Sequence, residues 1–273
     1  MGRCVSRTPK FKKPPVVETV IGVQFPELPE FASAHFGLYW NVIKRRYHKA
    51  EDRPRLPEVG EVFPRRPTVP IPNFRISNRA VPDRVWFTSE SGSELLQVQP
   101  DRFLFNWREQ AGEKYPSYTV NVRKFLRELN HFCQFCQNQG LGEPKPNVCE
   151  VAYINHIVPR DGESATELFA NVFPGLKWEF SEEWDLPLES VQYNRVFVIG
   201  DQLGRLYAEA SVASHPQMAK PFVFFRVTGR VNHPSDGNGE LSDSLRVAHD
   251  SVVNGFAAMT DPVIQKDRWG RTM

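Results

Sequence analysis

Apolar and polar side chains alternate along eight short stretches of the chain, a pattern typical of β-strands that bury one face. The predicted strands cover 16–25, 85–89, 95–99, 102–108, 147–158, 191–200, 204–213 and 222–231. Short turn signals such as SGS and Pro-Asp separate neighbouring stretches in the first half. Because such short connections favour antiparallel pairing, we predict a largely antiparallel sheet.

Four other stretches place apolar residues three or four positions apart, which is the spacing of an amphipathic helix. The predicted helices cover 30–48, 117–139, 163–173 and 241–259. Gly140 and Gly142 close the second helix, and Ser164 with Glu167 three residues later predicts a capping box at the start of the third.

The predicted elements follow the same order twice along the chain. Each half reads strand, helix, irregular connector, about three strands and a long helix, and the halves cover 14–142 and 143–273. We therefore predict an α+β fold in which duplicated β-α-β-β-β-α units form one continuous, curved, largely antiparallel sheet with helices on one face. This order resembles the saddle of TATA-box-binding-protein-like folds or a helix-grip arrangement in topology only, and topology does not define a function.

The irregular connector of the first half is rich in proline. Residues 54–82 contain seven prolines, and proline has no backbone N–H to donate to a neighbouring strand. We expect an extended connection that lies over the body of the protein.

Charge is distributed unevenly, although the net charge is only +2. Residues 1–13 carry five basic residues and no acidic one, and we expect them to form a disordered basic tail. Without those five, 29 basic residues stand against 32 acidic ones, so that the body carries a net charge of −3. A body of that charge argues against indiscriminate binding of nucleic acid.

The cysteines and the hydropathy pattern indicate a reduced, cytoplasmic setting. Cys4, Cys133, Cys136 and Cys149 fit no disulfide framework at this chain length. No run of 18 apolar residues occurs, and no apolar run of the signal-peptide type follows the basic N-terminus. We predict a cytoplasmic protein without a membrane partner.

The sequence contains few candidates for chemistry. Cys133 and Cys136 lie near the end of a predicted helix and have no second pair to complete a zinc site, so we predict buried thiols, no metal and no cofactor. No nucleophile elbow, phosphate-binding loop, zinc-protease motif or dinucleotide fingerprint is present. His156 and His249 are the candidates for acid–base catalysis, although structural histidines are more common.

Aromatic and arginine residues suggest a recognition surface. In the strand 222–231, one face is apolar and the other combines rings with guanidinium groups, a chemistry suited to anionic partners. The candidates on that second face are Phe222, Phe224, Arg226 and Arg230. The basic run Lys44, Arg45 and Arg46 is a weaker candidate. We expect the rings of Phe103, Phe105 and Trp107 to pack beneath the helices instead.

Several segments together resemble a sporadically distributed family of bacterial proteins that has no assigned function. The segments are PPVVETVIGVQF, FGLYW, LLQVQPDRFLFNWR with YPSY, YINHI and AHDSVVNGFAAMTDPVIQKDRWG. The resemblance covers nearly the whole chain after residue 13. It implies no catalytic residues, and its patchy distribution is compatible with horizontally exchanged systems such as phage-defence or toxin-related loci.

From these observations we predict a non-enzymatic binding or interaction protein, with a protein partner favoured. Its recognition surface would combine the open sheet face with the proline-rich connector. Two alternatives stay open. One is a saddle that binds nucleic acid through the same arginines and the basic tail, which predicts salt-dependent binding. The other is an enzyme or a nucleotide sensor built around His156 or His249, which requires the two histidines, or one of them with a carboxylate, to converge in a pocket. The oligomeric state is left open.

Overall fold

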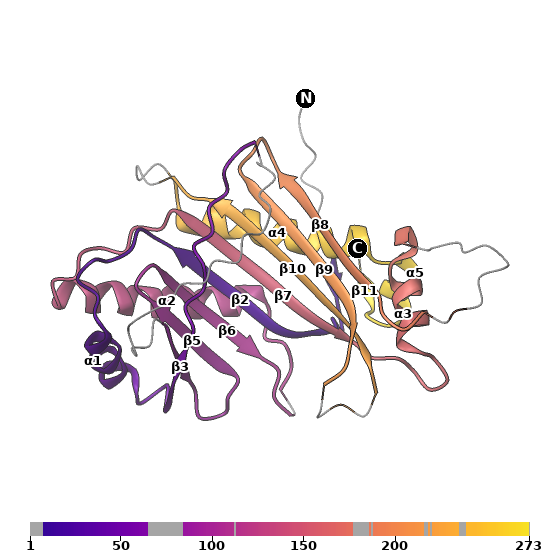
Figure 1. Cartoon of the computed structure of the whole chain (residues 1–273), viewed down its shortest axis with the longest axis horizontal. Coiled ribbons are helices and arrows are strands. Elements are labelled where there is room, and N and C mark those ends of the chain that lie inside the picture. Colours follow the sequence, from indigo (N-terminus) through magenta and orange to yellow (C-terminus); the bar gives the residue numbers. More distant parts are fainter. Residues whose placement is uncertain are drawn as a thin grey trace.

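The computed structural model describes residues 8–64, 84–111, 113–176, 186, 188–215, 218, 220–234 and 239–272. Its strands are β1 (Lys10–Phe11), β2 (Val16–Gln24), β3 (Lys49–Arg53), β4 (Arg84–Thr88), β5 (Glu94–Gln99), β6 (Arg102–Arg108), β7 (Val148–Ile157), β8 (Gln192–Ile199), β9 (Gly204–Ala213), β10 (Phe222–Asn232) and β11 (Arg271–Thr272). Nine of them pair side by side in one antiparallel sheet with the order β3-β4-β5-β6-β2-β7-β10-β9-β8 (Figure 1). The strands of each half stay together, and the halves meet where β2 pairs with β7.

Helices cover one face of this sheet. They are α1 (Ser33–Ile43), α2 (Tyr118–Asn138), α3 (Ala165–Val172), α4 (Leu241–Met259) and α5 (Pro262–Asp267). Figure 1 shows α2 and α4 crossing the same side of the sheet, α2 behind the first half and α4 behind the second. An α+β fold with a large antiparallel sheet is thereby confirmed. The capping box of α3 is also confirmed, because the Ser164 side chain accepts a hydrogen bond from the Glu167 N–H and the Glu167 carboxylate accepts one from the Ser164 N–H.

The core lies between the sheet and the helices. Phe103, Phe105 and Trp107 point from β6 into this layer and are buried, as predicted. The ring of Phe103 stacks on Phe132 of α2 with 5.1 Å between centroids. Because strand side chains alternate, the polar neighbours of these rings must lie on the opposite face, called the outer face below.

The proline-rich connector crosses the outer face. Residues 54–63, called the strap below, run from β3 across the front of the sheet toward β9 (Figure 1). Gln24 donates to the carbonyl of Val59 and accepts from its N–H, and Arg102 donates to the carbonyl of Pro57. The predicted extended connection is confirmed for the strap, and residues 65–82 lie outside the described residues.

Two regions differ from the prediction by more than the end residues of an element. The helix predicted over 30–48 ends at Ile43, and residues 49–53 form the edge strand β3 instead. The predicted disordered tail is wrong for Lys10 and Phe11, because they pair with β11, and the ring of Phe11 packs at 5.4 Å from that of Phe256. Residues 1–7 lie outside the described residues.

Candidate functional site

The predicted recognition residue Phe222 is not available at the surface. Its side chain is 3% exposed, and its ring lies 4.3 Å from the imidazole of His156 on the neighbouring strand. The prediction that Phe222 is an exposed ring is therefore wrong. Phe224, two residues along β10, is half-buried and lies 6.2 Å from the same imidazole.

Arg226 and Arg230 lie on the outer face of β10, but each already has a carboxylate partner. Arg226 donates to Glu209 of β9 at 2.6 Å, and Arg230 donates to Glu150 of β7 at 2.5 Å. Both partners lie directly across the ladder from their arginine. An external anion would have to compete with these two ion pairs.

The basic run after α1 contains two exposed cations and one that is paired with a carboxylate. Lys44 and Arg45 are exposed, whereas Arg46 donates to the carboxylate of Glu128 at 2.8 Å. The side chain of Glu128 is fully buried and also pairs with Arg127. Arg46 therefore helps to neutralise a buried carboxylate of α2, which is a structural role.

The two candidate histidines lie on opposite sides of the sheet. His156 lies on the outer face, whereas His249 belongs to α4 and stacks on Tyr118 with 3.8 Å between ring centroids. Burial lowers the pKa of both imidazoles, with His215 adding to the effect at His156 and Asp250 opposing it at His249. The structure does not bring the two together, which removes a catalytic site shared by both.

A denser group of cationic side chains lies on the outer face of the first half. The guanidinium–tryptophan cluster consists of Arg53 of β3, Arg84 and Trp86 of β4, and Arg108 of β6. The guanidinium carbons of Arg53, Arg84 and Arg108 lie 4.2, 5.6 and 4.7 Å from the centroid of the Trp86 ring. Arg53 and Arg108 approach from strands on opposite sides of β4, so the indole lies between two cations.

Amide side chains fix the cluster in place. The side-chain oxygen of Gln97 accepts hydrogen bonds from the indole N–H of Trp86 at 2.9 Å and from Nη1 of Arg84 at 2.8 Å. The amide nitrogen of Gln97 donates to Asn106. Since Gln97 and Asn106 are buried, the two groups that they orient have little freedom to move.

The cluster has more positive than negative charge. Its guanidinium groups are those of Arg53, Arg84 and Arg108, and the carboxylates that pair with them are those of Glu18 and Glu51. Within the described part of the chain, neither Arg84 nor Arg102 pairs with a carboxylate. The Nε atoms of Arg53 and Arg84 are buried and have no hydrogen-bond partner.

The pKa values follow this arrangement. Burial lowers the pKa of Arg84, and the charges of Arg102 and Arg53 lower it further. Burial also lowers the pKa of Arg102, whose hydrogen bonds go to the neutral oxygens of Gln24 and Pro57. A lowered arginine pKa means that the surroundings do not compensate the positive charge fully.

Sequence reasoning missed this cluster. The spacing of Arg84 and Trp86 was a usable signal, because residues two apart on a strand share a face, but the predicted strand began only at residue 85. The contribution of Arg53 depends on β3, which has no alternating apolar pattern, and that of Arg108 depends on the strand order. Neither is visible in the sequence alone.

The described residues contain no group of three or more histidine, cysteine, aspartate or glutamate side chains arranged to hold a metal ion. Burial raises the pKa of the Cys133 thiol to about 11 and that of Cys136 to about 12, so both are protonated at neutral pH. Cys4 lies outside the described residues.

In the described part of the chain, no helix combines the length and apolar character needed to cross a membrane.

Comparisons of the chain with protein-family models, with curated proteins and with solved structures found no match.

Proposed function

We propose that the protein is a non-enzymatic binding protein whose outer sheet face recognises an acidic segment of a protein partner at the guanidinium–tryptophan cluster. The observation that carries this proposal is the half-buried Arg84, which has no carboxylate partner among the described residues. Removing a charge from water without an opposite charge nearby is costly, so proteins rarely retain one unless a partner compensates it. A carboxylate of the partner would supply that compensation.

The form of the cluster favours a carboxylate partner over nucleic acid. Proteins bind single-stranded nucleic acid by stacking bases on exposed rings along a basic groove. Here Trp86 lies between Arg53 and Arg108, which leaves its ring poorly placed to stack on a base. The two candidate arginines of β10 are occupied by Glu209 and Glu150.

The connector takes part in this proposal through its two ends. Arg53 immediately precedes the connector and Arg84 follows it, and the two residues lie opposite each other in the β3–β4 ladder. An anion bound between them would contact the two arginines that flank the connector. We therefore assign the connector to the recognition surface together with the cluster.

We also propose that the two halves arose by duplication. The support is the strand order, because β2, β6, β5 and β4 follow one another outward on one side as β7, β10, β9 and β8 do on the other. The same strand order supports our proposal of a saddle-like topology. Membership of a defence or toxin-related system stays a prediction from the sequence resemblance.

Calorimetric titration with hexaglutamate, inorganic phosphate and a single-stranded oligonucleotide tests the proposed function. We expect hexaglutamate to bind, Arg84→Gln to weaken that binding roughly tenfold or more, and high salt to weaken it further. Arg226→Gln is the matched control, because Arg226 is already paired, and it should leave binding within about twofold. Absence of hexaglutamate binding, or equal losses in both variants, would overturn the proposal. Tighter binding of the oligonucleotide would favour the nucleic-acid alternative.

A further inference from the structure

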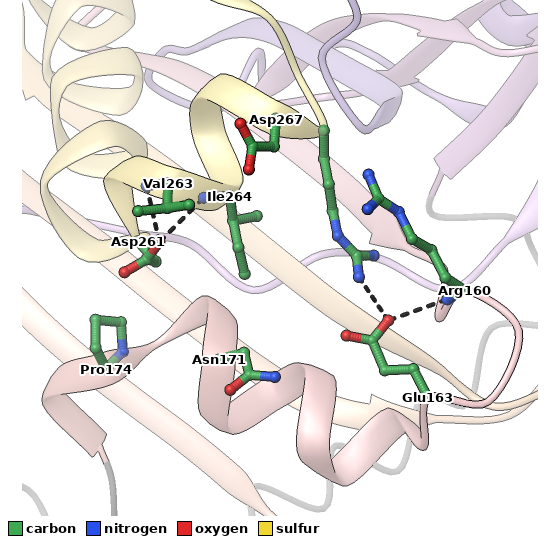
Figure 2. Close-up of a pocket in the computed structure, with 9 residues that line it drawn as sticks. Arg160, Glu163, Asn171, Pro174, Asp261, Val263, Ile264 and Asp267 are labelled. Carbon is green, nitrogen blue, oxygen red and sulfur yellow. Dashed lines mark hydrogen bonds and ion pairs between the residues drawn. The ribbon is translucent and has the colours of Figure 1, made fainter.

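A separate hollow of about 360 Å³ lies between α3 and α5, in the second half of the chain (Figure 2). Its walls are joined at both ends. At one end the N–H of Asp261 donates to the carbonyl of Val172, and at the other Arg268 donates to the carboxylate of Glu163 at 2.5 Å. The hollow is therefore formed before any ligand arrives.

The helix α5 that forms one wall is held firmly. The side-chain nitrogen of Gln265, a fully buried residue, donates to the carbonyls of Ala257 and Thr260 at 2.7 and 2.8 Å. Asp261 caps the helix, since one of its carboxylate oxygens accepts from the N–H groups of Val263 and Ile264. Groups carried by α5 thus have defined positions in the wall.

One end of the hollow presents a guanidinium group that can still bind an anion. Arg268 is occupied, because it donates to Glu163 and to the carbonyl of Val158. Arg160 uses its backbone N–H to bind Glu163, but its guanidinium group has no acceptor among the described residues. Figure 2 shows this guanidinium group extending beside the hollow, at the end where Glu163 lies.

The opposite end presents a carboxylate. Only Oδ1 of Asp261 takes part in capping α5, and Oδ2 has no partner within the described part of the chain. Asp261 and Pro174 lie at one end in Figure 2, Arg160 and Glu163 lie at the other, and Ile264 and Asn171 lie between them. From Asp261, which caps α5, to Asp267, the last residue of α5, a rise of 1.5 Å per residue gives a separation of about 9 Å along the hollow.

We propose that this hollow binds an extended zwitterion, a molecule with a carboxylate at one end, an ammonium group at the other and a short methylene chain between them. The carboxylate would pair with Arg160 and the ammonium group with Asp261, while the methylene chain would lie along Ile264, between the two ends. An ω-amino acid, or a basic amino acid bound through its carboxylate and side chain, has this chemistry. The volume lies within the range of small-molecule sites.

The experiment uses ligands of matched length. Binding of 6-aminohexanoate to the ¹⁵N-labelled full chain is followed by NMR, beside hexanoate, hexylamine and glycine. We expect 6-aminohexanoate to bind most tightly and to shift the amide signals of Val263, Ile264 and Arg160. Equal binding of hexanoate or of hexylamine would overturn the proposal, because one charge would then suffice. Equal binding of glycine would overturn the required separation, and so would the absence of binding at about 10 mM.

Two variants locate the charges. Arg160→Gln and Asp261→Asn should each weaken 6-aminohexanoate binding roughly tenfold or more, and asparagine preserves the helix cap. Arg246→Gln is the matched control, since Arg246 is exposed on α4 and does not line the hollow. Unchanged affinity in Arg160→Gln would contradict the assignment. Arg84→Gln should not change this binding, so failure here and failure of the proposed function are distinguishable.

Discussion

The strap is fastened at its far end by an ion pair between Glu61 and Arg205. The two side chains are 1% and 6% exposed, and Nη1 of Arg205 lies 2.5 Å from Oε2 of Glu61. The hydroxyl group of Tyr207 donates to the other carboxylate oxygen at 2.7 Å. Arg205 also donates to the carbonyl of Val62. The pair is therefore both buried and well hydrogen-bonded.

Removing one partner of such a pair should destabilise the protein strongly. Glu61→Gln leaves the Arg205 guanidinium group buried without its carboxylate, which typically costs about 3–5 kcal/mol. Replacing both residues, as in Glu61→Leu with Arg205→Met, removes both charges and should cost only about 1 kcal/mol. The double variant should thus lose about 3 kcal/mol less free energy of unfolding than Glu61→Gln does.

Urea unfolding followed by circular dichroism measures these free energies. At a slope of about 3 kcal/mol per molar urea, the loss in Glu61→Gln lowers the midpoint by about 1 M or more. Glu209→Gln is the control, because its pair with Arg226 is 37% and 45% exposed and should contribute less than about 1 kcal/mol. A loss below about 1 kcal/mol in Glu61→Gln, or a loss in the double variant as large as that in Glu61→Gln, would refute this account of the strap.

Three further substitutions have defined outcomes. Arg84→Met should raise the free energy of unfolding by about 1 kcal/mol, because it removes a half-buried charge without a carboxylate partner, and a lower urea midpoint would contradict this. Gly22→Ala should lower the free energy of unfolding by about 1–3 kcal/mol, because the added Cβ would lie 2.1 Å from Cδ2 of Leu104. Adding Leu104→Ala to this variant should restore part of the lost stability, as measured by thermal unfolding. Burial lowers the pKa of His249, so as the pH falls the unfolded chain binds this proton at a higher pH than the folded chain does. The free energy of unfolding should therefore decline from about pH 6.5 until the pH passes below the pKa of His249 in the folded chain. The stability profile of His249→Gln between pH 7 and 5 should be flatter, and an identical slope would exclude this linkage.

The alternation of side chains was enough to predict most of the sheet. It placed β6 with its rings toward the helices, because a strand with one buried face has a period of two. It failed for β3, whose sequence KAEDR has four charged residues among five and no apolar alternation. Such charged strands are typical of sheet edges, where charge discourages pairing with another chain. For this reason β3 was not predicted, and the predicted helix extended past Ile43, where α1 ends.

The candidate site could be predicted only as far as the face on which each side chain lies. Arg226 and Arg230 were assigned to the correct face, whereas Arg84 was not predicted as a site residue. What distinguishes them is the residue on the adjacent strand. Glu209 and Glu150 lie directly across from the first two, whereas Arg53, another cation, lies across from Arg84.

Strand register therefore determines whether an arginine on this sheet is neutralised or is able to bind a partner. A carboxylate directly across the ladder holds the guanidinium group in an internal ion pair, as Glu209 holds Arg226. A second guanidinium group in that position adds repulsion, which lowers the pKa of Arg84 beyond the effect of burial. Residues 53 and 84 are separated by the whole connector in sequence and become neighbours only when β3 pairs with β4. For this reason the surroundings of Arg84, which has no carboxylate partner among the described residues and on which the proposed function depends, appear only in the folded chain.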